Sequence, residues 1–155
     1  ALGSSFGLGY LPVIPGTWGA LPGIPLVLVI ILFTPASLHS LLIAFCLLIV
    51  SALTVILGPW AEQYWATKDP SIYVIDEVAG FLTTILLFRP SSLVHAIVWA
   101  FLLTRIIDII KPPPARQLEY IPGGWGILLD DICSSLYAVG ILYLLLYLRP
   151  AWFGL

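Results

Sequence analysis

The sequence predicts an all-α integral membrane protein of about four to five transmembrane helices in a single bundle, with a polar site near one membrane face. Of its 155 residues, 61% are hydrophobic and only 9% are charged, whereas soluble domains contain about 25% charged residues. Apolar stretches alternate with proline and glycine clusters. A net charge of −2 supplies no basic patch, so we expect no nucleic-acid partner. We treat residues 1–155 as one domain.

The candidate membrane helices follow from segment length, because a spanning helix needs about 20 mostly apolar residues. The first segment, Leu21–Phe33, is short, and we expect it to be tilted or to cross half of the bilayer. A segment of about Ile72–Phe88 is long enough only if Asp76 and Glu77 lie in its first turn. Three segments reach the full length: Leu38–Leu57, Leu93–Ile110 and about Ile127–Leu148.

Residues that disfavour helices mark the loops between these segments. They are Pro35, Gly58-Pro59, Asp69-Pro70, Arg89-Pro90, the prolines at 112–114, and Gly123-Gly124. If all five segments cross, one face receives the N-terminal stretch and the loops around residues 58–73 and 111–126. All eight acids lie on or near that face. Most basic residues do too, which by the positive-inside rule places the face in the cytoplasm.

Acids within membrane helices cost about 2.5–3.5 kcal/mol on insertion scales, so they indicate a polar cavity with partners. The sequence has such groups in three places: Asp76-Glu77, the pair Arg105 and Asp108, and Asp130-Asp131. Each group alone is also explained by a helix dipole or an internal ion pair. Because all three lie on one face of so uncharged a chain, we expect them to form a site.

The expected chemistry of this site is a divalent metal beside a phosphate. Mg²⁺ prefers oxygen ligands, and the metal ligands are expected to be Asp76, Glu77, Asp130 and Asp131. Cationic side chains would hold the phosphate, namely Arg105, Lys111 and Arg116. Asp108 either completes the metal site or orients Arg105, and the sequence does not separate these roles. One of the catalytic acids would be the general base for water: Asp76, Glu77, Asp108, Asp130 or Asp131.

The N-terminal stretch G-L-G-Y-L-P-V-I-P-G-T-W-G-A is a further candidate for phosphate binding. Gly16 and Gly19 permit close backbone approach, free N–H groups can line an anion site, and Thr17 adds a hydroxyl. A membrane-entry turn without a ligand explains the same glycines.

Spacing excludes several phosphatase mechanisms. A cysteine phosphatase needs an Arg six positions after its Cys, but Val139 follows Cys133 at that distance. His39 and His95 lie on the face opposite the acids, which excludes a histidine nucleophile. Metal-assisted attack by water remains. The competing class is a non-enzymatic transporter or ion pathway with intramembrane acids, although the acids here stop near one face.

Four separated motifs resemble those of the phosphatidylglycerophosphatase A family, in the same order and at similar spacing. They are P-V-I-P-G-T-W-G-A, K-D-P-S-I-Y-V-I-D-E-V-A-G, R-I-I-D-I-I-K-P-P-P-A-R and G-G-W-G-I-L-L-D-D. The resemblance covers roughly Gly7–Ser135. It implies a multi-pass enzyme of the bacterial cytoplasmic membrane that uses Mg²⁺ to hydrolyse the terminal phosphate of phosphatidylglycerophosphate. The products would be phosphatidylglycerol and inorganic phosphate.

The resemblance points to the same residues as the chemical argument: Asp76, Glu77, Arg105, Asp108, Lys111, Arg116, Asp130 and Asp131, with Gly16, Thr17 and Gly19. Two places depart from the family pattern. Thr104 stands where an aromatic often precedes the Arg, and Ser134-Ser135 replaces a small Ala-Gly pair. Neither removes a charge, so we expect them to affect substrate fit more than activity.

Overall fold

The computed structural model describes residues 2–11, 13–90 and 92–155, and in these ranges all regular structure is helical. The elements follow each other as η1 (Ser5–Tyr10), α1 (Pro15–Ala20), α2 (Gly23–Phe33), α3 (Ala36–Trp65), α4 (Asp76–Leu87), α5 (Leu93–Ile110), α6 (Ala115–Leu118), α7 (Gly124–Leu148) and η2 (Pro150–Phe153). The predicted all-α architecture is confirmed.

Four helical stretches are long and apolar enough to cross a membrane. They are Pro15–Phe33, which joins α1 and α2, and the helices α3, α5 and α7. Only 17% of the most apolar part of α3 is buried inside the protein. Its remaining apolar surface faces outward, where lipid chains can cover it. The chain is therefore a multi-pass membrane protein.

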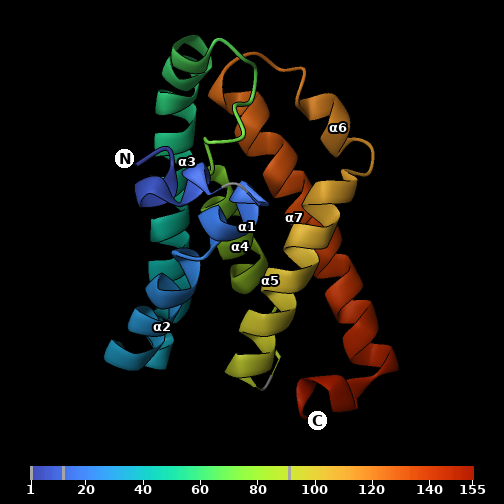
Figure 1. The fold of residues 1–155 in the computed structure, drawn as a ribbon. Helices are drawn as coiled ribbons and strands as arrows, with labels where there is room; N and C mark the ends of the chain where they lie inside the picture. The colour runs from blue at the N-terminus through green and yellow to red at the C-terminus, as the bar shows by residue number, and fades with distance from the viewer. Residues whose placement is uncertain (1, 12, 91) are drawn as a thin grey trace.

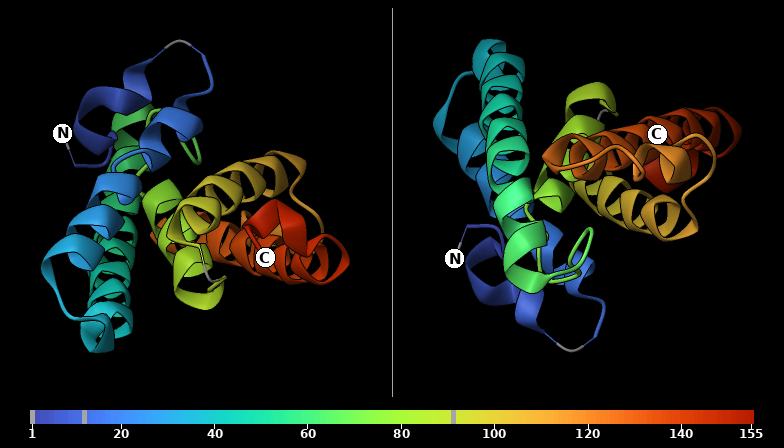
Figure 2. Two further views of the ribbon diagram at one scale, coloured as in Figure 1. Left: turned by 90° about the horizontal axis from the view of Figure 1, so that it is seen from below. Right: turned by 90° about the horizontal axis from the view of Figure 1, so that it is seen from above.

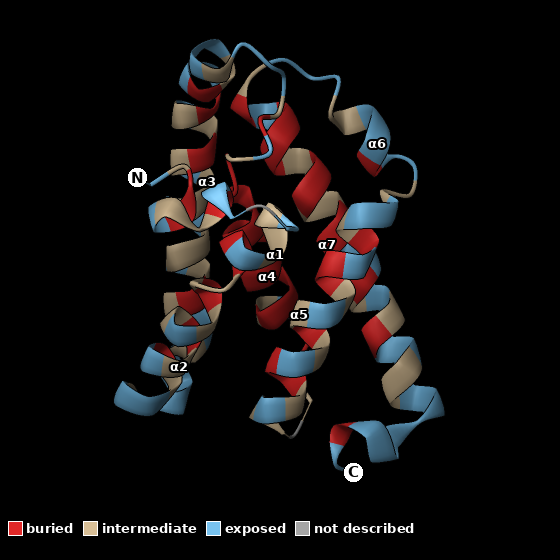
Figure 3. Cartoon of the chain, in the orientation of Figure 1, coloured by how far each residue is buried: buried red, intermediate tan, exposed pale blue. Residues whose placement is uncertain are grey.

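The short helix α4 lies between the α2–α3 pair and the α5–α7 pair (Figure 2). Its 12 residues span about 18 Å at 1.5 Å per residue, less than the hydrocarbon core of about 30 Å. The predicted segment Ile72–Phe88 is thus too long, because the helix begins only at Asp76. The preceding segment runs down into the bundle from the upper end of α3 (Figure 1). Almost all of α4 is buried (Figure 3).

Helix α3 continues through Pro59 to Trp65, so the predicted break at Gly58-Pro59 is wrong. Pro59 has no N–H, so the carbonyl four residues earlier, that of Val55, receives no helical bond from it. Gly124 packs directly against this stretch, where a Cβ on it would lie 2.6 Å from Val55 Cα. A Cβ on Gly58 would lie 2.5 Å from Gly124 Cα. The close crossing of α3 and α7 supports the helix on both sides of the proline.

The loops alternate as the sequence predicts. The α3–α4 connection and the segment carrying α6 lie at one end of the bundle, and the α2–α3 and α4–α5 turns lie at the other (Figure 1). His39 and His95 both sit at the latter end, bonded locally to Thr34 O and Ser92 Oγ. The main apolar core also lies toward that end, and includes Val27, Phe81, Leu82, Leu142 and Phe153.

Candidate metal centre and phosphate site

The first turn of α4 is positioned by bonds from the segment before it. The Tyr73 hydroxyl donates to Thr54 O at 2.9 Å, which fastens this segment to α3. The Val74 N–H donates to Gly3 O at 2.8 Å, and the Ser5 hydroxyl donates to Val74 O at 3.3 Å. The N-terminal segment and α3 thus hold the backbone that leads into Asp76 and Glu77.

Carboxylates from α4, α5 and α7 converge at this point. Asp76, Glu77 and Asp131 form one group, and Asp131 joins Asp108 and Asp130 in a second. Within each group, one oxygen per residue lies within 4.8 Å of the others. Asp76, Glu77, Asp130 and Asp131 are all buried, at 7% exposure or less. The three places singled out in the sequence therefore form one cluster.

Several oxygens of this cluster are buried without a hydrogen-bond partner among the described residues. They are Asp76 Oδ1, Asp108 Oδ1, Asp130 Oδ1 and Asp131 Oδ2. A buried, unpaired carboxylate oxygen carries a large desolvation cost unless a cation or donor meets it. An all-oxygen set with this excess of negative charge fits Mg²⁺. The residues present therefore fit the predicted metal.

The side chain of Arg105 extends from α5 toward the carboxylates of the cluster. Its guanidinium forms an ion pair with Glu77, and its Nη1 lies 3.4 Å from Asp108 Oδ2. The Arg105 side chain is only 8% exposed. Arg105 thus links the first turn of α4 to the last turns of α5.

Lys111 follows α5 and contacts a second set of acids. Its Nζ lies 2.7 Å from Asp130 Oδ2, contacts Glu119, and is 4.0 Å from Asp69 Oδ2. Burial lowers the pKa of Lys111, but hydrogen bonds to Asp130 and Glu119 raise it by more. The ammonium therefore stays charged, with its pKa above the ordinary value.

Sequence reasoning did not single out Asp69 or Glu119. Together with Asp130 they form a third group of acids whose oxygens lie close together. In the sequence, Asp69 belongs to the Asp69-Pro70 break, and Glu119 lies in the loop around residues 111–126. A signal was available, because both lie in the two loops that the topology brings to one face.

The N-terminal glycines contribute unequally. Gly16 lies against the ion pair, because a Cβ there would collide with Glu77 Oε1 and lie 2.9 Å from Arg105 Nη1. Gly19 packs instead on Val74, next to the segment that leads into α4. Thr17, between them on α1, is half-buried. A cavity of about 150 Å³ is lined by Gly16 together with Asp76, Lys111 and Asp131, whereas Thr17 and Gly19 lie outside its lining.

Arg116 is the one predicted cation that the structure places apart. It is exposed on α6 and has no ion pair with any residue the structure describes. It lies outside the lining of the acid cavity.

The four motifs thus meet at one acidic cavity of a membrane protein, and comparison with known sequences identifies the group to which such a chain belongs. A profile described as phosphatidylglycerophosphatase A matches residues 1–146. The chain belongs to the phosphatidylglycerophosphatase A family. Because this family is enzymatic, the chain is a phosphatase, and the transporter interpretation is set aside.

Members of the phosphatidylglycerophosphatase A family from two bacteria are similar over most of the chain. The Haemophilus influenzae phosphatidylglycerophosphatase A is 34% identical over 152 residues, covering 94% of this chain and 87% of the relative. The Escherichia coli phosphatidylglycerophosphatase A is 33% identical over 143 residues, covering 92% and 80%. A Bacteroides thetaiotaomicron protein, provisionally named a phosphatidylinositol-3-phosphatase, is 35% identical over 146 residues, covering 88% and 86%. No solved structure matches the chain significantly.

The two departures from the phosphatidylglycerophosphatase A pattern lie at helix contacts. Thr104 Oγ1 is 2.9 Å from Thr84 Oγ1, which joins α5 to α4. Ser135 Oγ is 2.9 Å from Gly80 O and 2.7 Å from Asp131 O, at the crossing of α7 and α4. Such bonds between membrane helices contribute about 0.6 kcal/mol each on average. These residues therefore hold α4 against its neighbours, just behind the acids.

Proposed function

We propose that this enzyme removes the terminal phosphate of phosphatidylglycerophosphate in a Mg²⁺-dependent hydrolysis that yields phosphatidylglycerol and inorganic phosphate. The observation that carries the proposal is the convergence of carboxylates from three helices with unpartnered oxygens in one cavity. The relatives named phosphatidylglycerophosphatase A support this substrate. We further propose that the acidic face lies in the cytoplasm, with the helices in the bacterial cytoplasmic membrane.

The proposed metal ligands are Asp76, Glu77, Asp130 and Asp131, with Asp108 as a fifth carboxylate in the same cluster. A bound Mg²⁺ supplies a Lewis acid and lowers the pKa of a coordinated water. The chain's own contribution is to hold these acids at fixed positions through α4, α5 and α7. One carboxylate of the cluster accepts the proton from the attacking water, as a general base must lie within hydrogen-bond reach of it.

Lys111, which lines the cavity, and Arg105, which pairs with Glu77 and Asp108 of the lining, are the proposed inner phosphate holders. An ammonium has three N–H donors, and Asp130 and Glu119 engage two of those on Lys111. The remaining donor of Lys111 is available to a phosphate oxygen, and its side chain is 20% exposed. Arg105 offers five donors in a planar fork, of which the acids use part.

The outer parts of the proposed phosphate site are Gly16, Thr17, Gly19 and Arg116. Gly16 allows the α1 backbone to approach Glu77 and Arg105, which a side chain would prevent. Thr17 adds a hydroxyl on the same short helix, and Gly19 keeps that helix close to Val74. Arg116 would contact the substrate from α6, outside the cavity.

Phosphate release from the purified protein in detergent micelles tests the proposal. We expect activity toward phosphatidylglycerophosphate with Mg²⁺, abolition by EDTA, and recovery when Mg²⁺ is restored. Phosphatidylinositol 3-phosphate is the comparison substrate, chosen because of the Bacteroides relative's name. Titration calorimetry with Mg²⁺ alone provides a second readout, and Asp131→Asn should weaken binding. Full activity in EDTA, or preference for the inositol lipid, would overturn the corresponding part of the proposal.

A further inference from the structure

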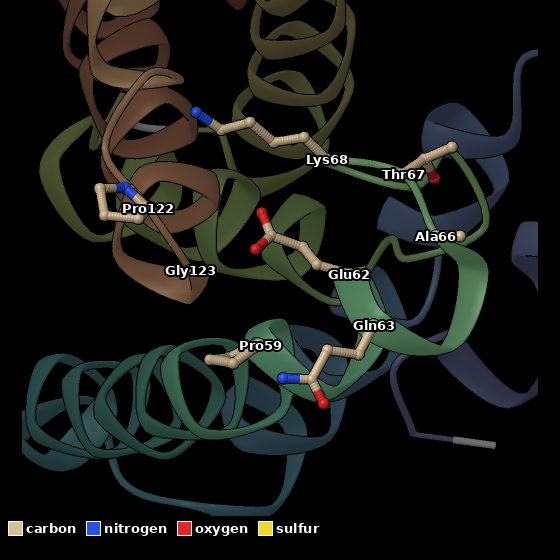
Figure 4. Close-up of a pocket in the computed structure, with 8 residues that line it drawn as sticks. All are labelled: Pro59, Glu62, Gln63, Ala66, Thr67, Lys68, Pro122 and Gly123. Atoms are coloured by element: carbon tan, nitrogen blue, oxygen red, sulfur yellow. The ribbon is translucent and has the colours of Figure 1, made fainter.

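A second cavity, of about 650 Å³, lies at the same end of the bundle as the acids (Figure 4). It opens between the C-terminal end of α3 and the segment that leads into α7. Its lining includes Pro59, Glu62, Gln63, Ala66, Thr67, Lys68, Pro122 and Gly123. The polar residues of this lining are Glu62, Gln63, Thr67 and Lys68, which suits a ligand that has both hydroxyl and anionic groups.

Glu62 and Lys68 are the charged residues of this cavity. The Glu62 carboxylate points into the space toward the Pro122–Gly123 segment (Figure 4). Its Oε1 is buried and has no hydrogen-bond partner in the part of the chain that the structure describes. A buried acceptor of this kind is expensive unless a donor reaches it. The Lys68 side chain extends along one side of the cavity (Figure 4), and its Nζ lies 5.6 Å from the centroid of the Tyr120 ring.

The cavity and the acid site are lined by adjacent residues of the loop after α3. Lys68 lines the larger cavity, and its chain neighbour Asp69 lines the smaller cavity that contains Asp76, Lys111 and Asp131. Asp69 Oδ2 lies 4.0 Å from Lys111 Nζ. Neighbouring residues of one loop thus line the two cavities, and a molecule that occupies both would pass residues 68–69.

The larger cavity also lies at the depth of lipid headgroups. Trp60, Tyr64 and Trp65 cluster on the same turns of α3, with ring centroids 5.0 to 5.9 Å apart. Trp60 and Tyr64 are exposed. Exposed Trp and Tyr at the end of a membrane helix mark the interface between hydrocarbon and water.

We propose that this cavity holds the glycerol and phosphodiester that link the terminal phosphate to the diacylglycerol of the substrate. This inference rests on the proposed function. Lys68 pairs with the phosphodiester, and Glu62 accepts a hydrogen bond from the glycerol hydroxyl. Glu62 and Lys68 would then select lipids whose phosphate is carried on a glycerol headgroup.

The test compares Lys68→Gln and Glu62→Gln with Lys68→Arg, which keeps the charge, and with Arg149→Gln, an exposed residue near the far end of the bundle. Three quantities are measured for each purified variant: the rate with phosphatidylglycerophosphate, inhibition by phosphatidylglycerol, and inhibition by inorganic phosphate. Phosphatidylglycerol retains the phosphodiester and glycerol but lacks the terminal phosphate. Inorganic phosphate reports on the acid site alone.

For Lys68→Gln we expect KM to rise about tenfold, the range of one lost charge-assisted hydrogen bond. The phosphatidylglycerol inhibition constant should rise similarly, while kcat and the phosphate inhibition constant stay within about twofold. Lys68→Arg, which keeps the charge, should show values close to those of the wild type. Glu62→Gln should weaken the binding of both phosphatidylglycerophosphate and phosphatidylglycerol.

Two outcomes overturn the inference. One is that Lys68→Gln and Glu62→Gln behave like Arg149→Gln, and the other is that phosphate inhibition weakens as much as lipid inhibition. If the wild-type protein were inactive toward phosphatidylglycerophosphate, the proposed function would be wrong, but the cavity could still be tested. In that case the melting temperature is measured with phosphatidylglycerol and with phosphatidylcholine. Phosphatidylglycerol should stabilise the wild type more, and Lys68→Gln should abolish this difference.

Discussion

The ammonium of Lys111 lies 2.7 Å from Asp130 Oδ2 and also contacts Glu119, so one cation joins the end of α5, the segment after α6, and α7. The other oxygen of Asp130, Oδ1, is buried with no partner among the described residues. Asp130 thus has one oxygen engaged by the chain and one left for a cation. This division allows metal binding and phosphate binding to be separated by mutation.

Asp130→Asn should affect the metal. The substitution keeps the shape of the side chain but removes a charge that a divalent cation needs. We expect turnover to fall by roughly 100-fold and half-activation to require far more Mg²⁺. Phosphate release measured across a range of Mg²⁺ concentrations gives both quantities. Near-normal turnover at ordinary Mg²⁺ would show that Asp130 is not a ligand.

Arg116→Ala should affect the substrate. Because Arg116 is exposed on α6 and outside the acid cavity, the Mg²⁺ requirement should stay nearly unchanged. The loss should appear mainly as a higher KM for the lipid. If Arg116→Ala shifts the Mg²⁺ dependence as strongly as Asp130→Asn, the division between ligands and phosphate holders is wrong.

Gly16→Ala should disturb the site without unfolding the protein. The added methyl group would displace the ion pair of Glu77 and Arg105, which Gly16 faces. We expect most activity to be lost while the protein still inserts and elutes as the wild type does. Gly140→Ala is the matched control, because a Cβ there meets no atom within 4 Å. Equal activity of the two variants would contradict a tight contact between α1 and the ion pair.

Gly58→Ala should lower stability. A methyl group at this position meets the backbone of Gly124, which cannot move aside as a flexible side chain could. Overpacking of this kind costs about 1–3 kcal/mol. Thermal or denaturant unfolding in detergent measures the loss, again against Gly140→Ala. An unchanged unfolding midpoint would mean that α3 and α7 do not cross closely.

Single cysteines should report the sidedness of the loops. After replacement of Cys46 and Cys133, cysteines at Ser71 and Gln117 should react with impermeant reagents from the cytoplasmic side. A cysteine at Ser37 should react from the opposite side. Ser37 is used in place of Ser91, a residue of the other loop expected on that side, because Ser91 lies outside the described residues. Labelling of Ser71 and Gln117 from different sides would rule out the proposed topology.

The sequence predicted the long helices well because length and hydropathy suffice for a membrane span. Leu93–Ile110 appears with the predicted bounds. The predicted helix break at Gly58-Pro59 was wrong for a tertiary reason. Gly58 packs against Gly124, a residue far away in the chain, and local sequence does not reveal such a contact. The predicted length of α4 is too great because an apolar pattern cannot distinguish a helix from the largely buried, non-helical segment before it.

The convergence of acids could be predicted because helix ends on one face must lie near each other. Part of the pairing within the cluster could be predicted too. An ion pair between Arg105 and Asp108 was one of the alternatives that their spacing allowed, and the structure shows it, but the pairing of Arg105 with Glu77 was not predicted. The contacts of Lys111 with Asp69 and Glu119 depend on how two loops fold over α7. Such details are set by side-chain packing and not by spacing.

The length of α3 has a consequence for how the enzyme meets its substrate. At 1.5 Å per residue its 30 residues extend about 45 Å, the full thickness of a bilayer including its headgroup layers. We therefore expect its last turns to stand among the headgroups, at the same end of the bundle as the acids. A lipid can present its phosphate there by lateral diffusion while its acyl chains remain in the bilayer. Turnover should then follow the surface density of substrate within the membrane, and diluting that surface with inert lipid should slow the enzyme even at constant bulk concentration.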